Sequence, residues 1–108
     1  MQLYGLKTCD TTRKALKTLR NAGVEVTYID VRDDGVPAEL LSQFIFAFGD
    51  KLLNKRSTTW RGLSDSKRAG DAHALLLEHP TLMKRPAIHV GKDLHLGWTK
   101  DVEAAVLG

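Results

Sequence analysis

The first third of the chain follows a strand–helix–strand pattern, and this pattern limits the possible folds more than any other feature of the sequence. Residues 2–5 predict a short apolar strand, and residues 13–21 carry apolar side chains at helical spacing before a C-terminal stop at Gly23. Residues 24–31 alternate apolar and polar side chains and continue as an apolar strand. Such units normally form right-handed crossovers between parallel strands. We therefore predict an α/β protein that begins with two parallel strands.

The remainder of the chain predicts a helical middle followed by a strand–strand–helix ending. The middle is rich in helix caps and apolar stripes, and the ending has a glycine turn between two short apolar runs. The expected elements are a helix from Pro37 to Gly49, short helices at 64–68 and 71–79, a hairpin of strands 87–90 and 94–96, and a last helix from Thr99.

This order of elements is that of a thioredoxin-like fold, in which a four-stranded mixed sheet carries a helical insertion. We predict a single domain over residues 1–108, with the insertion at about residues 37–80, because a chain of 108 residues leaves little room for two cores. The composition, 43% hydrophobic and 27% charged, is that of an ordinary globular protein.

Location and partners are constrained by the apolar runs, the cysteine count and the charge. No apolar run approaches the roughly 20 residues that span a membrane, and the first residues lack the features of a signal peptide. One cysteine cannot form a disulfide within the chain, so we expect a cytoplasmic protein without membrane association. The formal charge of +3 is too small to indicate a nucleic-acid-binding protein.

The only cysteine lies at the predicted junction of the first strand and the first helix, in Thr8-Cys9-Asp10-Thr11-Thr12. We expect Asp10, Thr11 or Thr12 to cap the helix. A thiol at this place faces unpaired N–H groups and the positive end of the helix dipole, which favour the nucleophilic thiolate. A buried structural cysteine is the alternative, but the polar neighbours favour a reactive one. Thr11 and Thr12 are candidate hydrogen-bond donors to the sulfur or to a bound oxyanion.

A second candidate is the Arg85-Pro86 pair at the start of the predicted third strand. The proline is either an edge device or, in a thioredoxin-like fold, a cis-proline that packs against the cysteine loop. The second interpretation places Arg85 beside Cys9. A guanidinium group there would stabilise the thiolate and bind an oxyanion or a carboxylate.

A cluster of basic residues and a set of histidines are weaker candidates. Lys51, Lys55, Arg56 and Arg61 lie in or next to a polar segment, residues 54–61, without a regular period; they are either a solvated surface or an anion-binding site. The four histidines include no pair at i, i+4, and if His89 and His95 face each other across the hairpin, two imidazoles still leave a metal site incomplete. We therefore predict no metal.

Four segments together resemble the ArsC/Spx group of thioredoxin-fold proteins, and most closely its YffB-like branch of arsenate-reductase-related proteins. They occur in the family's order along essentially the whole chain, and they are Tyr4-Gly5-Leu6-Lys7-Thr8-Cys9-Asp10-Thr11, Leu52-Leu53-Asn54-Lys55-Arg56-Ser57-Thr58-Thr59-Trp60-Arg61, His79-Pro80-Thr81-Leu82-Met83-Lys84-Arg85-Pro86 and Leu96-Gly97-Trp98.

The resemblance implies that Cys9 is the nucleophile and that Arg85 matches a catalytic, anion-binding arginine of glutaredoxin-coupled arsenate reductases. Two other arginines of those reductases fall at Asn54, which Lys55 and Arg56 follow, and near Trp98, where no arginine stands. These departures favour a glutathione-dependent thiol reductase, acting on a small oxyanion or a disulfide, over arsenate reduction itself.

Glutathione is then expected as a co-substrate and not as a tightly bound cofactor, with glutaredoxin as a further partner. The residues expected to bind substrate or glutathione are Thr11, Thr12, Asn54, Lys55, Arg56, Arg61 and Pro86. Spx-type regulators use the same fold to bind RNA polymerase, usually with a second cysteine three residues after the first. Thr12 occupies that position here, which excludes such a disulfide switch. A non-catalytic, Spx-like binding module is the competing hypothesis.

Overall fold

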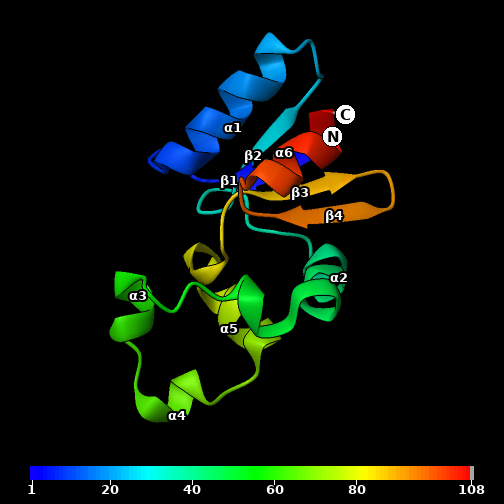
Figure 1. Ribbon diagram of the computed structural model, residues 1–108. Helices are drawn as coiled ribbons and strands as arrows, with labels where there is room; N and C mark the ends of the chain where they lie inside the picture. The colour runs from blue at the N-terminus through cyan, green and yellow to red at the C-terminus, as the bar shows by residue number, and fades with distance from the viewer. Residues whose placement is uncertain (108) are drawn as a thin grey trace.

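The computed structural model describes residues 1–107, and in it a small sheet carries helices on both faces (Figure 1). The elements are the strands β1 (Gln2–Gly5), β2 (Thr27–Asp30), β3 (Ala87–Val90) and β4 (Asp93–Leu96), the helices α1 (Asp10–Asn21), α2 (Ala38–Phe48), α3 (Thr58–Arg61), α4 (Asp65–Arg68), α5 (Ala72–Glu78) and α6 (Lys100–Leu107), and the 3₁₀ helices η1 (Gly49–Leu52) and η2 (Pro80–Leu82).

The four strands form one mixed sheet in the order β2-β1-β3-β4. β1 pairs with β2 in parallel and with β3 antiparallel, and β3 pairs with β4 in the antiparallel hairpin that the glycine turn predicted. The expected α/β fold with a four-stranded mixed sheet is confirmed. The carboxyl ends of β1 and β2 and the amino end of β3 consequently lie at the same edge of the sheet.

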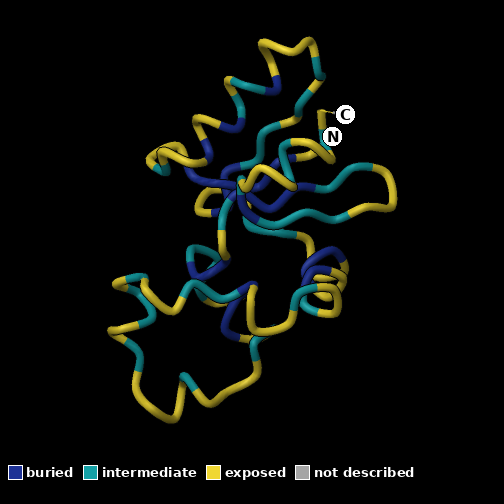
Figure 2. The backbone as a smooth tube through the Cα atoms, in the orientation of Figure 1, coloured by how far each residue is buried: buried dark blue, intermediate teal, exposed yellow. Residues whose placement is uncertain are grey.

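The two faces of the sheet carry separate apolar clusters. Leu3 and Ile88 pack with α1 and α6 on one face, whereas Tyr4 and Ala87 pack with α2, α5 and η2 on the other. This alternation follows from the strand geometry, because successive side chains point to opposite faces. Figure 2 shows the buried residues gathered along β1 and the start of β3 and on the inner sides of α1, α2 and α5.

Two elements near the amino terminus differ from their predicted bounds. α1 begins at Asp10 with Cys9 as its N-cap residue, so the expectation of a cap at positions 10–12 is wrong. The start moves because the N–H of Cys9 closes a turn onto the carbonyl of Leu6 at 3.0 Å, directly after β1. β2 covers only residues 27–30 of the predicted 24–31, since its ladder starts where the N–H of Thr27 meets the carbonyl of Met1.

The insertion contains the predicted helices and one that the sequence pattern did not predict. Ser64 caps α4 by accepting the N–H of Lys67, and Asp71 caps α5 by accepting the N–H of Ala74. α3 was missed because a single turn is too short to show a period, although Ser57 caps it by accepting the N–H of Trp60 at 3.1 Å. The insertion's middle is tied back to its end by a bridge between Leu53 and Met83.

The hairpin separates His89 and His95. Across the ladder Ile88 is opposite His95 and His89 is opposite Leu94, so the two imidazoles lie on opposite faces of the sheet and do not face each other. Residues 1–107 contain no cluster of three or more metal-ligating side chains. None of the helices in the same range has the length and hydrophobicity needed to cross a bilayer.

Candidate active site

Cys9 lies at the sheet edge where β1, β2 and β3 bring their loops together. The thiol is half-buried, and its residue has the extended backbone of an N-cap, with φ −85° and ψ 116°. Its carbonyl accepts the N–H of Arg13 at 3.1 Å, so α1 starts directly behind the sulfur. The helix dipole therefore acts on the sulfur, as the sequence indicated.

Thr12 occupies the first turn of α1 directly against β1. Its side chain is fully buried, and its Oγ1 has no hydrogen-bond partner of ordinary geometry among the described residues. It fits only because position 5 is a glycine: a Cβ on Gly5 would lie 2.4 Å from Cγ2 and 2.6 Å from Oγ1 of Thr12. Sequence reasoning placed Gly5 at the end of the first strand and missed this contact.

Arg85 reaches the thiol from the start of β3. The Arg85–Pro86 peptide bond is cis, as the second of the two interpretations requires, and Pro86 is buried. Nη1 of the guanidinium donates to the carbonyl oxygens of Thr81 at 2.5 Å and Met83 at 3.4 Å, which fixes its position. Its Nε is buried without a hydrogen-bond partner in residues 1–107. The group has donor capacity left for an acceptor that enters the site.

These groups change the acidity of the thiol. Burial raises the pKa of Cys9, but hydrogen bonds to the sulfur from the side chain and the backbone of Thr12 lower it. A hydrogen bond from Arg85 and the positive charge of its guanidinium lower it further, and the pKa is below its ordinary value. The structure thus brings together three residues that the sequence had selected separately.

A basic pocket of about 420 Å³ lies next to Arg85 along the chain. Its lining residues are Leu53, Asn54, Lys55, Arg56 and Lys84. Asn54 Oδ1 accepts the N–H of Arg56 at 3.2 Å, and Lys55 Nζ lies 5.7 Å from the ring centroid of Trp60. Lys84 is the residue here that the sequence reasoning missed. The N–H of Asn54 donates to the carbonyl of Leu82, and the N–H of Lys84 donates to the carbonyl of Leu52, both at 2.7 Å. These two hydrogen bonds hold the two chain segments that line the pocket side by side.

Two of the expected binding residues lie outside these contacts. Arg61 is exposed at the end of α3 and does not line the basic pocket; its carbonyl accepts Nη2 of Arg68 at 2.7 Å. Thr11 is exposed in the first turn of α1 and is not among the groups that shift the pKa of Cys9.

Asp30, at the end of β2, holds the cysteine loop in place. Its buried carboxylate accepts the N–H groups of Lys7 at 3.3 Å, Arg32 at 2.9 Å and Asp33 at 3.3 Å, and the hydroxyl of Tyr28 at 3.2 Å. Burial raises the pKa of Asp30, but these hydrogen bonds outweigh it and leave the pKa below its ordinary value. Sequence reasoning missed this residue, although an acidic side chain at the end of an apolar strand was a usable signal.

Comparison with known proteins gives a consistent result. The sequence profile of the ArsC family matches residues 4–105. An uncharacterised protein of Haemophilus influenzae is 47% identical over 91 residues, which is 80% of each chain. Among solved structures, a YFFB protein is 32% identical with a TM-score of 0.87, covering 99% of this chain and 98% of the other. An arsenate reductase (ArsC) related protein from Brucella melitensis is 33% identical with a TM-score of 0.72, covering 96% of this chain and 91% of the other. These neighbours have the thioredoxin-like fold predicted from the element order.

Proposed function

This chain belongs to the ArsC family, and from that premise we propose that it is a glutathione-dependent thiol reductase with Cys9 as its only catalytic thiol. The observation that carries the proposal is the environment of the sulfur, where Thr12 and Arg85 lower its pKa at the start of α1. A thiolate is the attacking species in disulfide exchange, so such an environment favours this chemistry.

The reaction begins with attack of the Cys9 thiolate on one sulfur of a small disulfide. A bond forms between the two sulfurs, and the other half of the substrate leaves as a thiolate. Arg85 stabilises the negative charge that moves through the site, and its unpaired Nε is one donor available for it. Glutathione then attacks Cys9, releasing the second half of the substrate and leaving a mixed disulfide between Cys9 and glutathione.

A second thiol completes the cycle, because no other cysteine exists in the chain. Another glutathione, or glutaredoxin, attacks the glutathione sulfur and regenerates the Cys9 thiolate. In sum, one disulfide and two glutathione molecules yield two thiols and one glutathione disulfide. The basic pocket formed by Asn54, Lys55, Arg56 and Lys84 supplies cations for the two carboxylates of glutathione.

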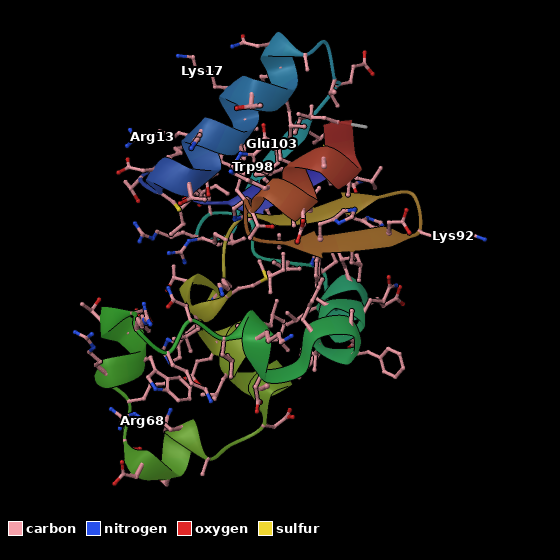
Figure 3. All side chains as sticks on the ribbon, in the orientation of Figure 1. Arg13, Lys17, Arg68, Lys92, Trp98 and Glu103 are labelled. Carbon is pink, nitrogen blue, oxygen red and sulfur yellow. The ribbon has the colours of Figure 1, made fainter. Side chains whose placement is uncertain are left out.

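A disulfide suits the site better than arsenate. Asn54 stands at one of the positions where the related reductases carry an arginine, and Trp98, near the other, packs against the cluster between the sheet, α1 and α6 (Figure 3). Arg85 is then the single arginine that acts on the sulfur. We therefore propose that the enzyme reduces disulfides in preference to arsenate.

The test is glutathione-dependent reduction of bis(2-hydroxyethyl) disulfide. Cys9→Ser abolishes turnover, and Arg85→Ala lowers kcat about 100-fold, as removal of one charge-stabilising donor does in other enzymes. Lys55→Gln and Arg56→Gln raise KM for glutathione, whereas Lys92→Gln, in the exposed hairpin turn, is the matched charge control. Full activity in Cys9→Ser contradicts the proposal.

The competing binding-module hypothesis predicts a different outcome. It requires a Cys9 thiol with an ordinary pKa and no change in NMR shifts when glutathione is added. Shifts at Cys9, Arg85 and residues 54–56 that saturate with glutathione favour the reductase.

A further inference from the structure

A second pocket, of about 290 Å³, is lined by Thr12, three residues after Cys9, and shares no lining residue with the basic pocket. Leu6, Leu16 and Tyr28 form its apolar part, and we call it the α1 pocket because half of its wall comes from that helix. We propose that it binds the hydrocarbon chain and terminal carboxylate of a linear thiol whose sulfur is joined to Cys9. This inference rests on the proposed function, since it names the class of disulfide that the enzyme takes.

Two residues connect the α1 pocket to the thiol. Thr12 lines the pocket and lowers the pKa of the Cys9 thiol, and its buried Oγ1 has no hydrogen-bond partner of ordinary geometry within residues 1–107. Tyr28 lines it as well; burial and the charge of Asp30 raise the pKa of Tyr28 to about 12, and the charge of Cys9 contributes to the same shift. A substrate held by the sulfur therefore has this pocket directly within reach.

The charges around the α1 pocket favour an anion. Lys7, Arg13 and Arg20 line it, and no carboxylate does so in the described part of the chain. Two of the three cations are already engaged: Arg13 pairs with Asp10, and Lys7 lies 3.8 Å from Asp33. Arg20 forms no salt bridge within residues 1–107, so it is the cation available to a ligand.

The spacing of these residues sets the length of the ligand. Thr12, Leu16 and Arg20 follow one another at i, i+4 and i+8 on one face of α1, a distance of about 12 Å along the helix axis. Side chains on a helix lean toward its amino end, so the guanidinium of Arg20 lies nearer the thiol than its Cα does. A chain of several methylene groups over Leu16 is needed to join the sulfur to Arg20. The ligand class is therefore an ω-mercapto carboxylic acid.

The binding experiment separates this pocket from catalysis. Hexanoate is titrated into the Cys9→Ser protein at fixed ionic strength, and backbone amide shifts are followed by NMR. Saturable shifts are expected at Leu16, Arg20 and Tyr28, and Arg20→Gln raises the Kd about tenfold through loss of a charge-assisted hydrogen bond. Lys17→Gln is the matched control, because it removes one exposed charge from the same helix outside the pocket (Figure 3).

The same pair of variants is then compared in turnover. The substrates are the symmetrical disulfide of 6-mercaptohexanoate and the neutral bis(2-hydroxyethyl) disulfide, each reduced with glutathione. The ratio compared is the KM of the mercaptohexanoate disulfide divided by the KM of the neutral disulfide. Arg20→Gln raises this ratio about tenfold, and Lys17→Gln leaves it as in the wild type.

The outcomes distinguish this inference from the proposed function. Hexanoate shifts that map elsewhere, or equal weakening by Lys17→Gln and Arg20→Gln, overturn the α1 pocket as the carboxylate site even when the neutral disulfide is reduced. If the wild type reduces neither disulfide with glutathione, the proposed reductase function is wrong. Hexanoate binding then still decides whether the α1 pocket is an anion site.

Discussion

At the scale of single residues, Thr12 has the strongest influence on the thiol. It is buried against the backbone of Gly5, and it lowers the pKa of the Cys9 thiol. Thr12 thus places a hydroxyl, and not a second thiol, three residues after Cys9.

Thr12→Val is predicted to make the thiol less acidic. Valine has nearly the same shape, so it keeps the packing against Gly5 and removes only the hydroxyl. The pH profile of Cys9 alkylation by iodoacetamide shifts to higher pH. At acid pH, where most of the thiol is protonated, the rate falls about tenfold, the effect of losing one hydrogen bond to a charged group.

Thr11→Val is the control for this measurement, because Thr11 is exposed in the same helical turn. An unchanged profile in Thr12→Val, or an equal shift in both variants, would show that the hydroxyl does not act on the sulfur.

At the scale of elements, three chain segments meet at one edge of the sheet. The cysteine loop follows β1, Asp30 ends β2 and Arg85 precedes β3. Asp30 joins two of these segments through its hydrogen bond to the N–H of Lys7. The position of the thiol therefore depends on a carboxylate that takes no part in the reaction.

Asp30→Asn is predicted to lower the free energy of unfolding by about 2 kcal/mol at pH 7, because the amide keeps one accepting oxygen and its NH2 group cannot accept the hydrogen bonds that the second carboxylate oxygen receives. The pKa of Asp30 is lower in the folded state than its ordinary value of 3.8, so its stabilisation is complete above that value. The stabilisation is lost as the pH falls through the folded pKa.

Urea unfolding at several pH values measures both effects. The wild type loses stability below about pH 4, and the difference between it and Asp30→Asn shrinks there. Asp34→Asn is the control, since Asp34 is an exposed carboxylate in the same turn. A difference between wild type and Asp30→Asn that persists unchanged at low pH would contradict the assignment.

The helices and strands were predictable from the sequence where it shows a full apolar period or a clear capping residue. The start of α1 was not, because Cys9 is a poor cap by composition and takes the position through a turn onto Leu6. Arg85 was predicted near the thiol only through the cis-proline of the expected fold. Lys84 and Gly5 depend on contacts between segments far apart in the chain, which no local pattern encodes.

At the scale of the whole molecule, one core joins the sheet to the helical insertion. Phe44 of α2 is fully buried and packs edge-to-face on Tyr4 of β1, with ring centroids 6.4 Å apart, and lies stacked 6.2 Å from Phe48. The insertion therefore shares its apolar contacts with the central strand. We expect the sheet and the insertion to unfold together.

Phe44→Ala is predicted to destabilise the protein by about 3–5 kcal/mol, the usual cost of removing a buried aromatic ring. Phe46→Ala, on the same helix but 95% exposed, changes stability by no more than about 0.5 kcal/mol. Thermal unfolding followed by circular dichroism and by tryptophan fluorescence measures this. Two separate transitions, with only one moved by Phe44→Ala, would show that the sheet and the insertion are independent units.

The hairpin turn has a consequence for labelling the molecule. Gly91 and Lys92 connect β3 to β4 at the end of the sheet opposite the cysteine loop, and Lys92 projects into solvent there (Figure 3). Since Cys9 is the chain's only thiol, the double variant Cys9→Ser, Lys92→Cys offers one attachment point for a dye or a spin label. A label at this place reports tumbling and partner binding from the end of the sheet opposite the cysteine loop, where the only change is Cys9→Ser.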